Sequence, residues 1–231
     1  MKMINATSAD NAVELAAMLF IEKANGQPDA PVGLATGGTM DGVYLKLEEM
    51  KYHPKTKHAF ALDDYVGLEP GNPNSYASEL NQKFAQRLDW TGNLHVPGSG
   101  DYQGELGSDR FEETIRTLGP LSVQLLGLGS NGHIAFNEPG SEPDSLTRIV
   151  ELHPATRSDN ARFFASPAEV PTHAVTQGLA TISRASSLVL VVLGEKKLPA
   201  LRQALTSPSA LTPLAALLEH EDLTLITDLV I

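Results

Sequence analysis

Residues 31–50, PVGLATGGTMDGVYLKLEEM, decide the fold. The apolar run at 31–35 has the length of a buried strand, and the polar turn TGGT at 36–39 ends it. Apolar residues then recur at helical spacing as far as Met50. A buried strand that passes through a short turn into a helix is the building unit of α/β proteins with a parallel sheet.

The same unit recurs along the whole chain. Apolar runs of strand length alternate with stretches of helical spacing, and no linker, low-complexity segment or internal repeat divides them. We therefore predict a single doubly wound, Rossmann-like α/β domain over residues 1–231, with a mostly parallel sheet covered by helices on both faces. Strands are expected at 31–35, 58–62, 122–126, 187–193 and 223–227, and helices at 13–24, 43–50, 80–88, 111–118, 175–182, 197–205 and 211–218.

Composition limits the classes of partner. A net charge of −11 argues against a nucleic-acid backbone or an anionic membrane, while a few local donors could still hold a small anion. The absence of cysteine removes disulfides, thiolate metal sites and cysteine nucleophiles. Residues 1–7 lack the features of a secretory signal, and the longest apolar run, 188–193, is too short to cross a bilayer. We expect a soluble, cytoplasmic protein.

The carboxyl ends of the predicted strands are where a ligand is expected, since sheets of this class bind ligands at that edge. Thr36, Gly37, Gly38 and Thr39 follow one such strand and open a helix, where free amides and the helix dipole favour an anion. A tight turn with Thr39 as helix cap explains the same residues without a ligand. The loop is not a P-loop, because no Lys-Ser/Thr pair follows the glycines.

Asp63 and Asp64 directly follow the strand predicted at 58–62. Two neighbouring carboxylates can divide into an ionised group and a group whose pKa is raised by its neighbour, which suits acid–base catalysis. Solvated loop acids that cap a turn are the commoner fate of such a pair. Their place at the carboxyl edge of the sheet favours a functional role.

The loop GLGSNGH at 127–133 matches the G-x-G-x-x-G fingerprint of dinucleotide-binding folds. In those folds the loop opens a crossover helix, but here the prolines at 139 and 143 interrupt any helix within two turns. Nicotinamide binding is therefore not expected. The alternative is a glycine-rich loop that holds His133 and Glu138 in a site, with the imidazole as an oriented acid–base group.

Two cations complete the set of candidate residues. Lys197 follows the strand predicted at 187–193, and Arg162 lies in the segment 151–170, which has two prolines and little periodicity. Most lysine and arginine side chains are surface groups without a specific role. In an acidic protein, one cation at a strand end and one on a lid would form a phosphate clamp, so we predict a mobile lid at about 151–170.

Together these motifs resemble the glucosamine-6-phosphate deaminase family. The strings that carry the resemblance are LATGGT at 34–39, LDDYVG at 62–67, GHIAFNEPG at 132–140, TR at 156–157, NARFF at 160–164 and VLG at 192–194 before Lys197. The nonapeptide at 132–140 is the most specific of them. Because the strings match in order, the resemblance spans nearly the whole chain.

The resemblance implies a reaction and individual roles. Members of the family isomerise and deaminate glucosamine 6-phosphate to fructose 6-phosphate and ammonia, without a metal ion or an organic cofactor. Asp63 would move a proton between C2 and C1, His133 would open the sugar ring, and Glu138 would orient and tune His133. The groups that the resemblance assigns to the 6-phosphate are the loop Thr36-Gly37-Gly38-Thr39, Arg162 and Lys197.

Two departures from the family pattern affect catalysis and regulation. Asn131 is a candidate catalytic residue, and some members of the family carry an aspartate at this position. The negative charge of an aspartate would raise the pKa of the histidine, whereas a neutral amide has no such effect. The longer, allosteric hexamers use a basic cluster and a C-terminal extension. This sequence has Arg148, which leaves a weak anion site, but it has Val150 at the next alternate position and stops at Ile231. The resemblance therefore implies the short, non-allosteric type, and we expect a monomer.

A 6-phosphogluconolactonase-like sugar-phosphate hydrolase is the nearest alternative, since that related fold has a similar glycine-histidine loop. It leaves Asp63 and the FNEP run at 136–139 without an explanation. A non-enzymatic sugar-phosphate sensor is a third hypothesis, which measurable turnover would exclude.

Overall fold

The computed structural model describes residues 1–161, 164–207 and 212–231. Its centre is a seven-stranded sheet in which neighbouring strands are parallel. The spatial order is β1 (Lys2–Asn5), β10 (Leu223–Thr227), β9 (Leu188–Val192), β6 (Val123–Gly127), β2 (Val32–Leu34), β3 (His58–Ala61) and β5 (Asn93–His95). The five strands predicted from the sequence are confirmed, and β1 and β5, at the two edges, are additional.

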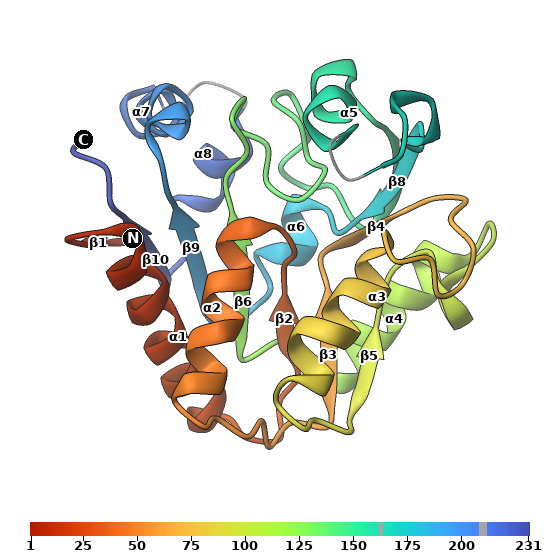
Figure 1. Ribbon diagram of the computed structural model, residues 1–231, viewed down its shortest axis with the longest axis horizontal. Helices are drawn as coiled ribbons and strands as arrows, with labels where there is room; N and C mark the ends of the chain where they lie inside the picture. Colours follow the sequence, from red (N-terminus) through yellow and green to blue (C-terminus); the bar gives the residue numbers. More distant parts are fainter. Residues whose placement is uncertain (162–163, 208–211) are drawn as a thin grey trace.

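Helices cover both faces of this sheet, which confirms the doubly wound class (Figure 1). The chain moves from β1 out to β5 with helices on one face, and it returns through β6 to β10 with helices on the other. The reversal places β2 and β6 side by side, where sheets of this class open a crevice.

The helices are α1 (Ala9–Gly26), α2 (Gly38–Glu49), α3 (Tyr76–Leu80) with the π-helical η1 (Asn81–Gln86), η2 (Gly100–Tyr102), α4 (Gly107–Leu118), α5 (Pro154–Asn160), η4 (Pro167–Glu169), α6 (Leu179–Ile182), η5 (Glu195–Lys197), α7 (Leu198–Thr206) and α8 (Pro213–Leu217).

Burial and capping explain why these elements form. β9 and β10 are buried at every residue, so both appear in the sequence as continuous apolar runs. α1 begins after Ser8, whose hydroxyl oxygen accepts a hydrogen bond from the Asn11 amide. α4 ends at Gly119, whose φ of +95° suits glycine. Within the described ranges, no helix combines the length and the apolar character that a membrane span needs.

A second sheet, antiparallel and three-stranded, lies beyond the carboxyl ends of the first (Figure 1). Its order is β4 (Asp63–Tyr65), β8 (His173–Thr176) and β7 (Arg148–Glu151). Leu62 joins the two sheets: its N–H donates to the Leu34 carbonyl (3.1 Å), and its carbonyl accepts from the Gln177 N–H (2.7 Å). Asp63 therefore stands where the chain leaves one sheet for the other.

The second sheet is not predicted from the sequence, and the helix predicted at 175–182 is wrong in its first half. Val175 belongs to β8, and α6 begins only at Leu179. Val175, Leu179 and Ile182 are spaced as on one face of a helix. The spacing is misleading, because the first residue lies in a strand and the other two lie in a short helix after a turn.

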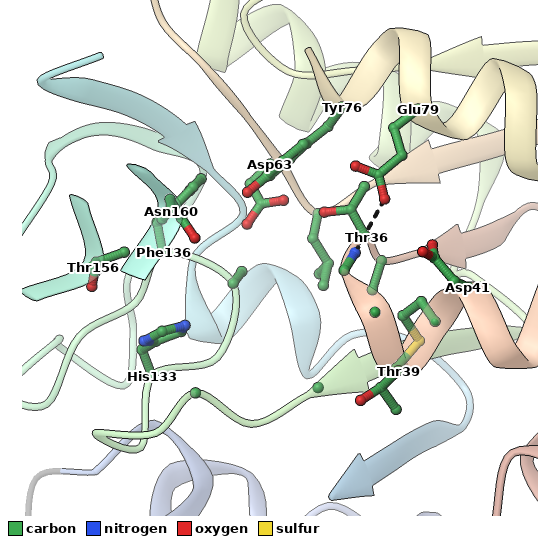
Figure 2. A pocket seen from close by; sticks show the side chains of 18 of the residues that line it. Thr36, Thr39, Asp41, Asp63, Tyr76, Glu79, His133, Phe136, Thr156 and Asn160 are labelled. Atoms are coloured by element: carbon green, nitrogen blue, oxygen red, sulfur yellow. Dashed lines mark hydrogen bonds between the residues drawn. The ribbon is translucent and has the colours of Figure 1, made fainter. Parts of the chain in front are cut away.

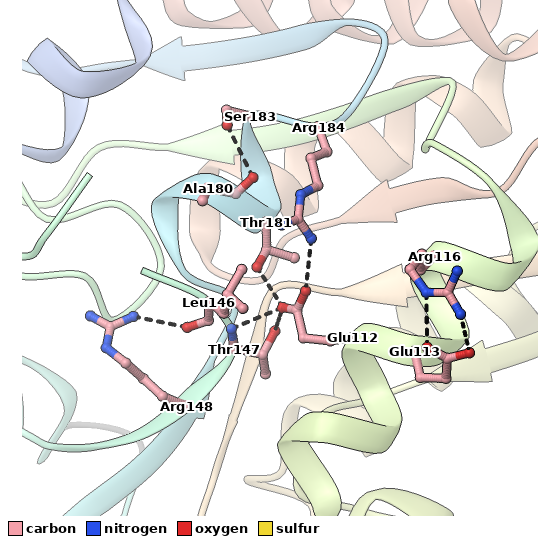
Figure 3. A network of polar contacts seen from close by, with 10 residues as sticks. All are labelled: Glu112, Glu113, Arg116, Leu146, Thr147, Arg148, Ala180, Thr181, Ser183 and Arg184. Carbon is pink, nitrogen blue, oxygen red and sulfur yellow. Dashed lines mark hydrogen bonds and ion pairs between the residues drawn. The ribbon is translucent and has the colours of Figure 1, made fainter. Parts of the chain in front are cut away.

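Glu112 of α4 ties the second sheet to the body of the protein (Figure 3). Its carboxylate accepts hydrogen bonds from the Thr147 N–H (2.9 Å) and from the hydroxyls of Thr147 and Thr181 (2.5 Å each), and it pairs with Arg184 (3.1 Å). This one side chain therefore connects α4, the start of β7 and α6.

Gly178 lies at the same junction, between β8 and α6. The Ser145 carbonyl accepts a hydrogen bond from the Ala180 N–H (3.0 Å), and the Ser145 hydroxyl oxygen accepts one from the Leu179 N–H (3.1 Å). A Cβ at position 178 would lie 2.1 Å from the Ser145 carbonyl oxygen. The neighbouring main chain therefore excludes any larger residue.

Gly178→Ala is expected to destabilise the protein by about 1–3 kcal/mol, because the added Cβ has to displace main-chain atoms. Gly26 is the matched control, since it ends α1 with no atom within 4 Å of the Cβ position. Gly26→Ala should be neutral or stabilising by up to about 1 kcal/mol. Urea unfolding of the three proteins measures both effects, and a Gly178→Ala protein as stable as wild type would contradict the close approach.

Candidate active site

A large cavity of about 910 Å³ opens at the carboxyl edge of the parallel sheet (Figure 2). It lies at the ends of β2 and β6, beside the point where the strand order reverses. The predicted site residues that line it are Thr36, Gly37, Gly38, Thr39, Asp63, His133 and Lys197. Four separate stretches of the sequence therefore meet at one cavity, as their positions after strands predict.

The loop at 36–39 forms the N-terminus of α2. Gly37 precedes the helix with a φ of +99°, a conformation that other residues rarely adopt. Gly38 and Thr39 supply first-turn N–H groups, which have no acceptor within a helix and can hold an anion. The Gly37 N–H is different, because it donates to the Glu79 carboxylate at 3.3 Å (Figure 2).

Glu79 belongs to an acidic cluster on the cavity wall that the sequence analysis did not identify. Lys83 Nζ lies 2.7 Å from Asp41 Oδ1 and 3.1 Å from Glu79 Oε1. All three residues line the cavity. One cation between two carboxylates leaves this wall negative, so an anionic ligand is not attracted from this side.

The neighbouring aspartates have different surroundings. Asp64 accepts hydrogen bonds from the backbone N–H groups of Tyr65 (2.8 Å), Tyr76 (2.8 Å) and Ala77 (3.1 Å), so it holds α3 against β4. Asp63 lines the cavity although it is only 7% exposed. Within residues 1–161, 164–207 and 212–231, its carboxylate accepts no hydrogen bond.

These different surroundings act differently on the pKa values of Asp63 and Asp64. Burial raises the pKa of Asp63 well above its ordinary value, and the charges of Asp64 and Glu79 add to the rise. Burial also raises the pKa of Asp64, but the three amide hydrogen bonds oppose it. A carboxylate that is costly to ionise is a strong base once ionised, so Asp63 suits proton abstraction from a ligand in the cavity.

A chain of hydrogen bonds holds His133 at the cavity. Its Nδ1 lies 2.7 Å from Asn131 Oδ1, and Asn131 Nδ2 donates to Glu138 Oε2 at 2.6 Å. The Thr156 hydroxyl donates to the other carboxylate oxygen, Glu138 Oε1, at 2.5 Å. Glu138 therefore reaches the imidazole through Asn131, a connection that sequence reasoning did not reveal.

The loop around His133 is fixed by steric fit and by a tight turn. A Cβ on Gly129 would lie 2.3 Å from the His133 ring, so the imidazole fills the space that this glycine leaves. Ile134 and Asn137 exchange two backbone hydrogen bonds (3.2 and 3.0 Å), and Ala135 between them has a φ of +54°. The next regular element is β7 rather than a crossover helix, as the prolines at 139 and 143 predict.

Arg148 braces this turn. Its guanidinium donates to Asn137 Oδ1 at 2.9 Å, and the fully buried Asn137 amide donates to the carbonyls of Ile134 (3.1 Å) and Gln177 (2.8 Å). Burial lowers the Arg148 pKa. Arg148, which the sequence suggests as a weak anion site, thus contacts the loop that carries His133.

The remaining predicted residues have three different outcomes. Lys197 ends η5 after β9 and lines the cavity, whereas Arg162 lies outside the described residues. From the segment predicted as a lid, Thr156, Asn160 and Phe164 line the cavity. In the part of the chain that the structure describes, no three acidic or histidine side chains gather as a metal site requires.

Comparisons with known proteins place this chain in a family. The family model described as glucosamine-6-phosphate isomerases/6-phosphogluconolactonase matches residues 5–226. A glucosamine-6-phosphate deaminase of Corynebacterium urealyticum is 43% identical over 204 residues, covering 85% of this chain and 79% of its own. Glucosamine-6-phosphate deaminase 1 of Bacillus subtilis is 36% identical, covering 99% and 97%.

Solved structures show the same relationship. The structure of a monomeric glucosamine-6-phosphate deaminase superposes with a TM-score of 0.92 at 35% identity, covering 98% of this chain and 97% of its own. The 6-phosphogluconolactonase of Trypanosoma brucei shares the fold, with a TM-score of 0.74 at 17% identity and coverages of 98% and 95%. The chain belongs to the glucosamine-6-phosphate isomerase/6-phosphogluconolactonase family, among its glucosamine-6-phosphate deaminases.

Proposed function

We propose that this protein is a glucosamine-6-phosphate deaminase, which converts glucosamine 6-phosphate and water to fructose 6-phosphate and ammonia. The observation that carries the proposal is the buried Asp63 carboxylate, which lines the same cavity as the histidine relay. A base of this kind suits proton transfer at carbon, and an oriented imidazole suits proton transfer at oxygen. Relatives at 36–43% identity carry this name.

His133 opens the sugar ring in this proposal. Because Asn131 Oδ1 accepts the Nδ1–H, Nε2 is the nitrogen that can take the proton of the C1 hydroxyl and return one to the ring oxygen. Opening produces an aldehyde at C1. The neighbouring carbonyl makes the proton on C2 acidic enough for a carboxylate to remove.

Asp63 then acts as the base. Its carboxylate takes the C2 proton while the aldehyde oxygen gains the proton that the C2 ammonium gives up, which gives an enolamine with a hydroxyl on C1 and an amine on C2. The same carboxyl group returns the proton to C1, and water hydrolyses the resulting imine at C2 to the ketone and ammonia. Burial of Asp63 keeps this proton away from bulk water between the two transfers.

The loop at 36–39 is proposed to hold the 6-phosphate. The N–H groups of Gly38 and Thr39 and the Lys197 ammonium supply donors at the cavity, and Arg162 would add a guanidinium. The Gly37 N–H can take part only when it exchanges its hydrogen bond with Glu79 for one with the phosphate. The phosphate is a remote handle whose binding energy positions the reacting carbons.

The segment 151–170 is proposed to act as a lid, as the sequence suggests. Its support is that Thr156, Asn160 and Phe164 line the cavity, so movement of this segment would open or close the site. We also propose a monomer that acts in the cytoplasm. The resemblance to a deaminase described as monomeric supports the first part, and the cysteine-free composition suits the second.

A sugar-phosphate lactonase remains the competing function, since lactonases share the fold. The purified protein should release ammonia and fructose 6-phosphate from glucosamine 6-phosphate. It should hydrolyse 6-phosphogluconolactone no faster than buffer does. The reverse pattern of activities would select the lactonase.

The two aspartates should separate catalysis from stability. Asp63→Asn is expected to reduce turnover by about 10²–10⁴-fold, because the base is lost, while the affinity for inorganic phosphate stays unchanged. Asp64→Asn should instead lower the free energy of unfolding by about 1–3 kcal/mol, because up to three backbone amides lose their charged acceptor. Steady-state kinetics and urea unfolding of both variants test this, and near-normal turnover by Asp63→Asn would remove Asp63 from the mechanism.

Asp63 should also govern the pH dependence. Since its pKa in the folded protein is raised, turnover should increase with pH along an acidic limb above the ordinary value of 3.8. The contribution of Asp63 to stability is fully present below pH 3.8 and is lost as pH rises through the folded-state pKa. Asp63→Asn should therefore be more stable than wild type at neutral pH, and the difference should vanish below pH 3.8. Melting temperatures of the two proteins across this range check the sign.

Lys197→Ala should raise KM for glucosamine 6-phosphate by roughly 10–100-fold, with a smaller change in kcat, because it removes a charge-assisted contact worth about 1.5–3 kcal/mol. Lys196 is the matched control, since it is the preceding lysine and is exposed. Competition by inorganic phosphate should weaken in Lys197→Ala and stay unchanged in Lys196→Ala. Equal KM values in the two variants would place the phosphate elsewhere.

A further inference from the structure

The hydrogen-bond chain that holds His133 ends on the segment proposed as a lid. Thr156 belongs to α5 and is only 4% exposed, and its hydroxyl donates to Glu138 Oε1 at 2.5 Å. α5 and the residues after it also contact the aromatic cluster beside the cavity: Asn160 hydrogen-bonds to Tyr65, and the Phe164 and Tyr65 rings lie 5.6 Å apart, edge to face. Docking of this segment and order in the relay are therefore physically linked.

The chemistry of the donors fixes the direction of every hydrogen bond in the relay. Glu138 as a carboxylate only accepts, so the Asn131 group that faces it must be the NH₂. The Asn131 oxygen then faces His133 and requires a proton on Nδ1. In this tautomer the lone pair is on Nε2, which is the state that ring opening needs at neutral pH.

Removal of the Thr156 hydroxyl changes this arrangement. Glu138 is half-buried and would keep one side-chain donor, Asn131, among residues 1–161, 164–207 and 212–231, so its carboxylate would turn towards water. The exposed Asn131 side chain would then lose the fixed acceptor of its NH₂, and its oxygen, which also accepts a hydrogen bond from the His133 backbone N–H at 3.2 Å, could move away from the imidazole. Without a fixed acceptor at Nδ1, the imidazole would also populate the opposite tautomer, in which Nε2 carries the proton and cannot accept one.

We infer that Thr156 is a positioning residue for ring opening: when α5 docks, its hydroxyl fixes Glu138, and through Asn131 it sets the Nδ1–H tautomer of His133. The inference rests on the proposed function, to which it adds a link between lid closure and acid–base chemistry. It assigns a role to a residue whose side chain donates to Glu138.

A matched pair of variants tests the hydroxyl itself. Thr156→Val keeps the shape and loses the donor, whereas Thr156→Ser keeps the donor. Misplacement of the acid–base group should lower kcat of Thr156→Val by about 10- to 100-fold with little change in KM, and Thr156→Ser should stay within about threefold of wild type. Unchanged kcat in Thr156→Val, or an equal loss in both variants, would overturn the inference.

Two further measurements separate positioning from a general structural effect. In the double variant Thr156→Val/Glu138→Gln, the losses should not multiply, because both changes break one chain of contacts; losses that multiply would contradict the inference. Nitrogen NMR of the labelled His133 should show the Nδ1–H tautomer in wild type and Thr156→Ser, and the Nε2–H tautomer or a mixture in Thr156→Val. An unchanged tautomer in Thr156→Val would again overturn it. These spectra need no turnover, so they test the inference even if wild type forms no fructose 6-phosphate. Absence of fructose 6-phosphate would contradict the proposed function and not the inference.

Discussion

A carboxylate kept out of water at the seam between two sheets is the constraint on which the rest of this structure depends. Asp63, the proposed base, is buried, and burial strengthens a carboxylate as a base. Burial of an ionisable group is costly unless its surroundings are built for it. The parallel sheet supplies the floor through Leu62, and β8 pairs with β4 to supply a wall. Asp64 fixes α3 on the remaining side by accepting hydrogen bonds from the backbone amides of Tyr76 and Ala77. The small sheet and α3 thus enclose one side chain that the large sheet puts in place.

The fold could be predicted from the sequence where burial is uniform. β9 and β10 are buried at every residue, so their sequences differ clearly from the helices around them. The second sheet could not be predicted in this way. β7 alternates between partly buried and exposed residues over only four positions, and β4 consists of two aspartates and a tyrosine. Such strands exist because a partner is already in place, and single-sequence patterns contain no trace of the partner.

The candidate site divides along the same line. Asp63, His133 and the loop at 36–39 could be predicted because each follows a strand, and parallel strands end at one edge. Glu79 and Thr156 come from helices, and a glutamate or a threonine in a helix is too common to attract attention. Their importance arises from contacts with other segments: Glu79 accepts from the Gly37 amide, and Thr156 donates to Glu138. Contacts between segments so far apart in the sequence are known only once the chain is folded.

The contact between Gly129 and His133 has a consequence for how such sequences are interpreted. In dinucleotide-binding folds the spaced glycines make room for a pyrophosphate against the main chain. Here the same letters make room for an imidazole, whose ring would overlap a Cβ at position 129. Room for a pyrophosphate and room for an imidazole therefore require the same glycine pattern in the sequence. The glycine pattern indicates that a bulky group packs against the backbone. The element that follows the loop then distinguishes a cofactor from a side chain of the protein itself.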